Sequence, residues 1–223
     1  MFLLVVIVVA VLIGIWYAQY RARLARTNAV AAIGRTVGFT FSAEDPDFIV
    51  SMPFVLFSRG DGRGVENVLS GEHEGIPMRL FDYWYYDETH DSRGGRSRQY
   101  HRFTCGLATI PAACPRFQVG HENFLTHLGD HLGMHDVELE YDDFNREFRV
   151  KCDDQKFAFS LLDGQMMEWM LRAGSFAAVE LDGPWVLVAA NRMPPAQWLT
   201  LGSWLEQFHR LIPPVVYATY PPQ

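Results

Sequence analysis

The sequence predicts an α+β protein: an N-terminal transmembrane helix followed by an antiparallel β-sheet domain, with two main helices of the C-terminal half packed on the sheet. Three observations lead to this prediction. The chain begins with a long apolar run, its middle alternates with the period of two that strands require, and two later segments repeat apolar residues at helical spacing. Because strands and helices do not alternate along the chain, the sheet is expected to be antiparallel.

The apolar run extends from Phe2 to Ala18, and the first charged residue after it is Arg21. An α-helix rises about 1.5 Å per residue, so about 17–20 residues cross a hydrocarbon layer of about 30 Å. Aromatic rings at the downstream end suit the level of lipid headgroups. These rings belong to Trp16, Tyr17 and Tyr20. We therefore expect residues 1–20 to be a transmembrane anchor that contacts the bilayer through residues 2–18.

A cleaved signal peptide is the alternative interpretation of the same run. Signal peptides carry basic residues before the apolar segment, whereas here only Met1 precedes it. Ala29-Val30-Ala31 resembles a cleavage site, but three arginines separate it from the apolar run. A buried core helix is the remaining alternative, and the apolarity on every face of the segment argues against it.

Basic residues follow the span at Arg21, Arg23 and Arg26. Because positive charge is retained on the cytoplasmic side of a membrane, we expect the following domain to lie in the cytoplasm. Residues 21–38 are expected to form a juxtamembrane helical stalk ended by Gly38, and residues 39–223 one soluble domain. The stalk arginines either contact anionic headgroups or lie in solvent, and the sequence favours neither arrangement.

Eight segments of the soluble domain have the composition of strands. They cover residues 65–70, 76–87, 99–110, 116–119, 137–141, 147–152, 177–181 and 185–189. Glu74-Gly75 and Asp182-Gly183 have the composition of hairpin turns. Residues 87–98 are expected to form a longer mobile loop, and Pro111 and Pro115 are expected to interrupt the chain between two strands.

Two helices are expected late in the chain. Asp153-Asp154 is expected to cap a helix over residues 156–172, with Gly174 after its end. The last helix is expected to begin after Pro194-Pro195 and to run to about Leu211. Its core-facing stripe consists of Trp198, Leu201, Leu205, Phe208 and Ile212. Shorter helical segments are expected after Asp45-Pro46 and over residues 124–132.

Composition limits the class of function. The chain has 26 acidic and 19 basic residues and a formal net charge of −7. Nucleic-acid binding requires clustered positive charge, so we expect no nucleic-acid partner. The three cysteines have no CxxC spacing and predict no disulfide framework. No nucleophile elbow and no phosphate-binding loop occur in the sequence, and we expect no cofactor.

One strand is unusually aromatic. Alternation places Phe81, Tyr83 and Tyr85 on one face of that strand, and Trp84 and Tyr86 on the other. The strand is then either buried on both faces, or it presents Trp84 and Tyr86 to a partner protein, since such rings often dominate binding energy at interfaces.

Histidines at residues 127, 131 and 135 are spaced four apart, which would place them on one face of a continuous helix. His127, Asp130 and His131 could then bind a divalent metal. Gly129 and Gly133 interrupt this helix, so a polar, exposed segment is the favoured interpretation.

Two parts of the chain carry a resemblance to known proteins. They are residues 144–169, with FNREFRV at 144–150, Asp153-Asp154 and residues 157–169, and the upstream hairpin of residues 68–83. In these parts the chain resembles a family of uncharacterised bacterial single-pass membrane proteins of the "domain of unknown function" kind. This resemblance implies placement in a bacterial membrane and carries no established catalytic residues.

Two functions therefore remain. The favoured one is a non-enzymatic interaction or scaffold module at the bacterial inner membrane, which another membrane-associated protein would bind at Trp84 and Tyr86. The alternative is a metal-dependent hydrolase that would use the cluster around His127 and His131.

Overall fold

A computed structural model describes the chain except residues 1, 91–94, 123, 126–132, 174–177 and 223. It confirms the α+β class: one long helix, α1 (Phe2–Val37), precedes a seven-stranded antiparallel sheet with helices packed on it. The strands are β1 (Thr40–Glu44), β2 (Gly62–His73), β3 (Ile76–His90), β4 (Arg96–Gly120), β5 (His135–Asp136), β6 (Arg149–Cys152) and β7 (Ala178–Asn191).

The helical elements after α1 are mostly short. Those whose bounds the structure describes are η1 (Ile49–Ser51), η2 (Leu56–Ser58), α3 (Asp142–Glu147), α4 (Gln155–Leu161), α5 (Gly164–Ala173), η3 (Pro195–Gln197), α6 (Trp198–Leu211) and α7 (Pro214–Thr219). Helix α6 matches the predicted last helix, and the residues of its predicted stripe are all buried. The predicted turn at Glu74-Gly75 is also present, with both residues at positive φ.

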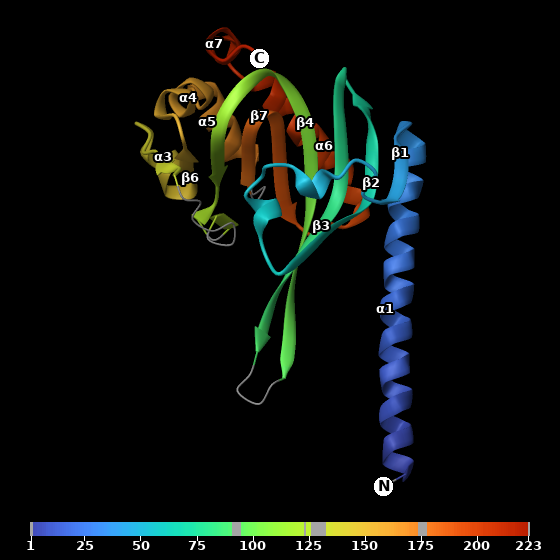
Figure 1. Cartoon of the computed structure of the whole chain (residues 1–223). Coiled ribbons are helices and arrows are strands. Elements are labelled where there is room, and N and C mark those ends of the chain that lie inside the picture. The colour runs from blue at the N-terminus through green and yellow to red at the C-terminus, as the bar shows by residue number, and fades with distance from the viewer. Residues whose placement is uncertain (1, 91–94, 123, 126–132, 174–177, 223) are drawn as a thin grey trace.

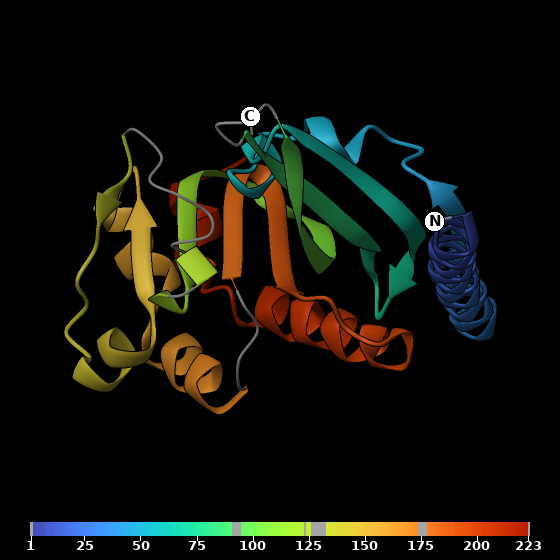
Figure 2. The same cartoon turned by 90° about the horizontal axis from the view of Figure 1, so that it is seen from below.

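The sheet separates two hydrophobic cores. On one face, α6 packs on Met78 and Leu80 of β3, whereas on the other face the segment with η1 and η2 covers Phe81 and Tyr83. Seen from below, α1 lies at the edge of the sheet beside β1 (Figure 2). The alternation predicted for the aromatic strand is therefore confirmed, because Phe81, Tyr83 and Tyr85 all point into one core.

Strand β4 corrects two predictions. It is continuous through Pro111 and Pro115, where we expected an interruption, and its register against β7 shifts on either side of Cys114. The prolines are accommodated because they lie at bulges, where a ladder hydrogen bond is already missing. The expected long loop over residues 87–98 is also mostly strand, since β3 and β4 remain paired as far as His90 and Arg96.

Strand β7 corrects a third prediction. Residues 177–189 do not form a hairpin around Asp182-Gly183; the described part is one strand that pairs with β4 on both sides of Gly183. Gly183 has a φ of 54° and lies opposite Cys114, so both strands bend at the same point. Glycine adopts positive φ without strain, so Asp-Gly is found both in hairpin turns and at bulges. Here Gly183 allows β7 to follow the bend of β4.

The helix predicted over residues 156–172 is two helices. Asp154 accepts a hydrogen bond from the Lys156 amide and caps α4, as predicted. Asp163 accepts one from the Met166 amide and begins α5, which divides the segment. Gly174 and most of the predicted helix at residues 124–132 lie outside the described residues.

The predicted strand over residues 137–141 is also wrong. Pairing with β6 ends after the Val137 amide, which donates to the Val150 carbonyl at 2.9 Å. Beyond that point the Asn145 side chain binds both the amide and the carbonyl of Leu139. An asparagine side chain thus takes the place of a neighbouring strand.

One buried carboxylate joins β7 to the segment before β2. Glu180 of β7 accepts hydrogen bonds from the amides of Val55 and Leu56 at 2.8 and 3.1 Å. Burial raises the pKa of Glu180 from its ordinary 4.5 to about 7, although these amides act in the opposite direction.

We expect this group to make the fold less stable as the pH rises. Between pH 4.5 and 7 the folded chain holds the Glu180 proton more tightly than the unfolded chain does, so raising the pH through this window costs up to about 3 kcal/mol. The measurement is urea unfolding of the wild type and Glu180→Gln in neutral detergent at several pH values. A difference in unfolding free energy that stays constant from pH 4.5 to 7.5 would contradict the prediction.

Candidate functional site

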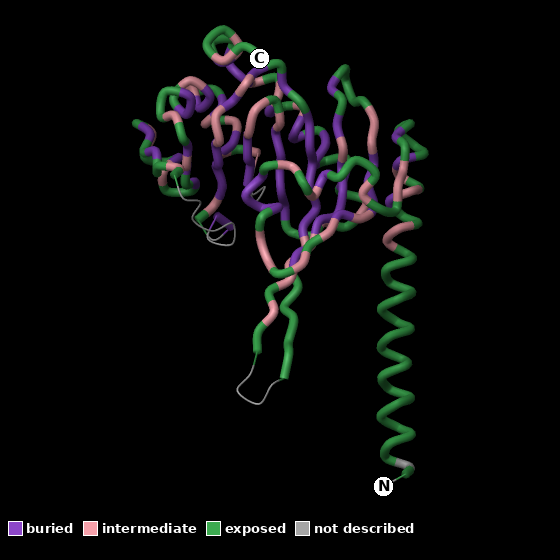
Figure 3. Tube along the Cα trace, in the orientation of Figure 1, coloured by how far each residue is buried: buried purple, intermediate pink, exposed green. Residues whose placement is uncertain are grey.

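The first part of α1 makes no contact that buries it. The described side chains from Phe2 to Ala25 are exposed (Figure 3). Its most apolar stretch has the length and composition of a membrane span, and none of that stretch is buried inside the structure. An exposed helix of this composition is unfavourable in water but suited to a bilayer, which indicates membrane association.

The second part of α1 is fixed to the sheet by a polar cluster that we call the α1 clamp: Arg26, Thr27, Asn67 and Asp82. Arg26 donates two hydrogen bonds to the Asp82 carboxylate, at 2.7 and 2.6 Å. Their side chains are 11% and 4% exposed, so the ion pair is largely buried. Asn67 also donates to Asp82 at 2.9 Å and accepts from the Thr27 hydroxyl at 2.8 Å. Every side chain of the clamp is therefore hydrogen-bonded to another.

A β-bulge directs Asn67 toward α1. The register of β2 against β3 shifts between Glu66 and Leu69, and Asn67 within this shift has a φ of 57°. Asparagine tolerates this left-handed conformation better than most residues do. The bulge gives the Asn67 side chain its contacts with both Thr27 and Asp82.

Close packing continues above the clamp. Val30 is fully buried, and Gly34 approaches the sheet so closely that a Cβ atom there would lie 2.6 Å from Leu69 Cδ2 and 3.2 Å from the Phe39 carbonyl oxygen. A larger residue at position 34 would push α1 away from β2. The helix is thus held by both a polar cluster and a close apolar contact.

The sequence predicted Trp84 and Tyr86 as partner-binding residues, and the structure places them together. Their rings are stacked, with centroids 6.3 Å apart, and Tyr100 of β4 lies 5.4 Å from Tyr86. We call these three residues the aromatic strip. Trp84 and Tyr86 are half-buried and Tyr100 is exposed.

Two glycines of β2 make room for the strip. Gly62 lies opposite Tyr86, and Gly64 lies opposite Trp84. A Cβ atom at Gly62 would come within 2.4 Å of the Tyr86 ring, and one at Gly64 within 2.7 Å of the Trp84 ring. The rings therefore lie flat over the glycine backbone, a cross-strand arrangement that keeps them in place without a covering helix.

The paired ends of β3 and β4 project on the same side of the domain as the free part of α1 (Figure 1). This projection carries a charged cluster in which Glu88 pairs with Arg98 at 2.9 Å and with Arg96 at 3.7 Å. Hydrogen bonding from Arg98 lowers the pKa of the Glu88 carboxyl. Charged side chains are costly in hydrocarbon, so we expect polar surroundings for this projection.

The other predicted interface residues are dispersed. Trp16 and Tyr20 stack on each other at 5.9 Å, and the Tyr17 hydroxyl accepts a hydrogen bond from Arg21 at 3.4 Å. Arg21 and Arg23 are exposed. Arg26 differs from the expectation, because it is part of the α1 clamp and pairs with Asp82 instead of a lipid.

The clamp itself was missed by sequence reasoning. The signal was Asp82, a carboxylate among the apolar and aromatic residues of a predicted strand. A buried charge of this kind requires a partner of opposite sign. The sequence does not show which of the arginines supplies it.

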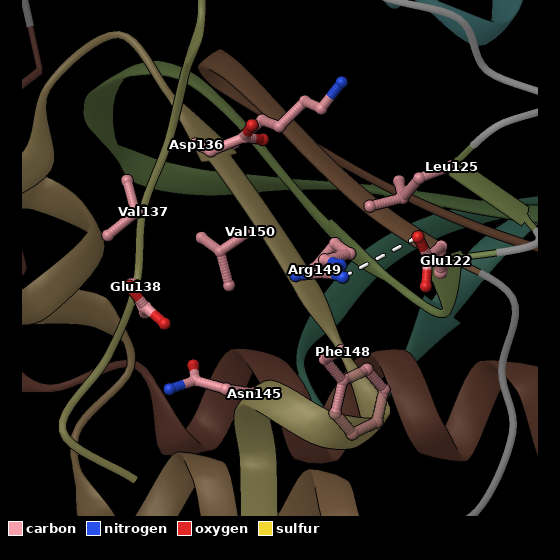
Figure 4. Close-up of a pocket in the computed structure, with 10 residues that line it drawn as sticks. Glu122, Leu125, Asp136, Val137, Glu138, Asn145, Phe148, Arg149 and Val150 are labelled. Carbon is pink, nitrogen blue, oxygen red and sulfur yellow. Dashed lines mark ion pairs between the residues drawn. The ribbon is translucent and has the colours of Figure 1, made fainter. Parts of the chain in front are cut away.

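A polar pocket of about 740 Å³ lies beside β5 and β6 (Figure 4). Its lining includes Asp136 and Glu138 as well as Lys151, and Arg149 pairs with Glu122 at 3.6 Å across an exposed surface. Charges of both signs line it, so it has no net attraction for one class of charged ligand.

The proposed metal ligands His127, Asp130 and His131 lie outside the described residues. Among the residues that the structure does describe, no group of three or more His, Cys, Asp or Glu side chains is close enough to hold a metal ion. Nothing described here adds support to the hydrolase alternative.

In sequence, the chain matches no protein-family model and no curated protein, which is consistent with the resemblance to an uncharacterised family. In structure, it is similar to the crystal structure of the mycobacterial trehalose monomycolate transport factor A, TtfA. The TM-score is 0.62 with 15% sequence identity, and the match covers 88% of this chain and 97% of that chain. At this identity the similarity shows a shared fold.

Replacing Asp82 with asparagine should loosen α1 from the domain. The variant leaves the Arg26 guanidinium buried without its counter-charge, which typically costs about 3–5 kcal/mol. We expect faster hydrogen exchange in residues 26–37 and a lower unfolding free energy in neutral detergent. Arg35→Ala is the matched control, because Arg35 is an exposed arginine on the same helix.

The double variant Arg26→Leu/Asp82→Leu distinguishes a lost ion pair from a buried unpaired charge. It should recover part of the stability that Asp82→Asn loses, since no charge is then left unpaired. Protection and stability equal to wild type in Asp82→Asn would show that the clamp does not hold α1.

Proposed function

We propose that the chain is a non-enzymatic protein-interaction module anchored at the bacterial inner membrane, and that it presents the aromatic strip to another membrane-associated protein. The α1 clamp is the observation that carries this proposal. Because the buried pair of Arg26 and Asp82 joins the exposed apolar helix to the sheet, the strip cannot turn freely relative to the anchor. The α1 clamp and the aromatic strip are also close in the fold, because β3 supplies both Asp82 of the clamp and Trp84 of the strip.

The proposed division of the chain follows the sequence. Residues 1–20 form the anchor, residues 21–38 the juxtamembrane helix and residues 39–223 the soluble domain. The clamp supports a rigid connection between the last two parts, since Arg26 and Thr27 precede Gly38 and bind residues of the sheet. The arginines at positions 21 and 23 support a cytoplasmic domain.

The protein of similar fold, TtfA, is named as a trehalose monomycolate transport factor. A transport-related role is consistent with the proposed interaction module, and no more than the fold is carried over from that protein. The aromatic strip suits such a role, because large stacked rings bury much area for little loss of side-chain freedom.

Photo-crosslinking in cells tests the aromatic strip. A photoreactive amino acid at position 86 of the full chain should form a discrete adduct with one membrane protein, and one at position 48 should not. Phe48 is the matched control because it is an aromatic residue that is 77% exposed and lies outside the strip.

Affinity for that partner gives the quantitative test. Trp84→Ala/Tyr86→Ala should weaken binding by about 30-fold or more, the loss of about 2 kcal/mol expected for one interface hot spot. Phe48→Ala should leave it unchanged. Equal recovery of the partner with the double variant and the wild type would remove the strip from the interface.

Protease accessibility tests the orientation. If the domain is cytoplasmic, protease added to intact spheroplasts should leave it whole, and lysis of the spheroplasts should expose it to cleavage. A periplasmic protein of the same cells serves as the positive control. Digestion of the domain in intact spheroplasts would contradict a cytoplasmic location.

A further inference from the structure

A pocket of about 850 Å³ separates α1 from the sheet below the clamp. It is formed by residues from three elements: α1, the start of β4 and the residue after β7. The arginines that line it are Arg23, Arg26, Arg102 and Arg192. Four arginines in one pocket are notable in a chain whose formal net charge is −7.

Only two of these arginines are neutralised. Arg26 binds Asp82 in the clamp, and Arg102 lies 3.4 Å from Glu66. Within the described part of the chain, neither Arg23 nor Arg192 has a carboxylate at ion-pairing distance. The pocket therefore keeps an excess of positive charge.

The surroundings of Arg192 reflect this excess. Desolvation in the pocket lowers the pKa of Arg192, and so does repulsion from the Arg26 and Arg102 guanidiniums, whereas the Asp82 and Glu66 carboxylates act in the opposite direction. A bound anion would relieve this repulsion and would gain from the low-dielectric walls of the pocket.

Aromatic rings place the pocket at a definite level of the membrane. Trp16 and Tyr20 of α1 line it from one side, and Tyr100 of the aromatic strip lines it from the other. Trp and Tyr at the end of a transmembrane span lie at the level of the headgroups. If α1 spans the bilayer as proposed, the pocket opens where lipid phosphates are found.

We propose that this pocket binds the headgroup phosphate of an anionic phospholipid, with Arg23 and Arg192 as its principal ligands. This inference rests on the proposed membrane anchoring. Guanidinium groups match phosphate oxygens in charge and bidentate geometry. The rings beside them offer apolar surface to the glycerol and upper acyl chain of the same lipid.

A free phosphate ion would bind the arginines through the same chemistry as a lipid headgroup phosphate. The aromatic rings of the pocket distinguish the two ligands. A soluble anion would use only the arginines, whereas a lipid uses the arginines and the apolar surface of Trp16 and Tyr20 together. The position of the pocket beside the apolar helix also gives a lipid direct access from the bilayer.

Native mass spectrometry of the delipidated full chain in neutral detergent tests the proposal. Phosphatidylglycerol should bind as a single tight equivalent, and phosphatidylcholine, which has no net charge, should bind much more weakly. Arg23→Gln/Arg192→Gln should weaken phosphatidylglycerol binding by about 30-fold, as expected for two arginines near a membrane surface. Arg35→Gln, an exposed arginine beyond the clamp, should not change it.

Each alternative outcome contradicts the proposal. Equal binding of the two lipids would show that charge is not selected, and an unchanged affinity in the double variant would place the lipid elsewhere. Displacement of phosphatidylglycerol by millimolar inorganic phosphate would make the ligand a soluble anion. Circular dichroism of the double variant should match the wild type, because both arginines are exposed.

The proposed function fails in a different way. If the chain fractionates with the membrane and crosslinks through position 86 but does not select phosphatidylglycerol, only the lipid site is lost. If the chain is absent from the membrane fraction, the anchor and the role built on it are both lost.

Discussion

The buried ion pair between Arg26 and Asp82 is the interaction on which the functional surfaces of this protein depend. Burying two charges is costly, and the cost is offset only when the remaining hydrogen-bonding capacity is also used. Here the carboxylate accepts two hydrogen bonds from Arg26 and one from Asn67. Asn67 is in turn held by Thr27 from the same helix. The cluster specifies one position of α1 on the sheet, because a shift of the helix would leave a buried charge unpaired.

The aromatic strip and the arginine pocket both depend on that position. Two rings of the aromatic strip, Trp84 and Tyr86, follow Asp82 along β3, so the clamp sets the height of the strip relative to α1. The arginine pocket exists because α1 and β4 are held apart at the level of Trp16 and Tyr100. A flexible stalk would provide neither surface with a fixed orientation, since a partner or lipid would then have to order the linker on binding.

Charge is distributed in a way that suits an anionic membrane. The chain is acidic as a whole, yet the pocket beside α1 gathers four arginines that face two carboxylates. In the proposed membrane-bound state, the local positive charge would attract anionic lipid, and the same membrane surface would repel the acidic remainder of the domain. The two effects together favour the orientation that the clamp already imposes.

The sequence by itself determined the fold class, the candidate membrane span, the two faces of the aromatic strand and the stripe of α6. In each of these the information is local, because hydrophobic periodicity reports which face of one element is buried. The N-cap of α4 at Asp154 could also be predicted, because the residues that form it are neighbours in the sequence.

Tertiary structure decided what local signals leave ambiguous. Turns and bulges favour the same residue types, so composition alone does not distinguish them at Pro111, Pro115 and Asp182-Gly183. In the folded chain these residues lie at bulges, because β4 and β7 pair along most of their length. The α1 clamp and the arginine pocket join residues separated by more than fifty positions, and neither could be derived from the order of residues alone. Any of several arginines could neutralise Asp82, and only the packing of α1 on the bulged strand β2 selects Arg26.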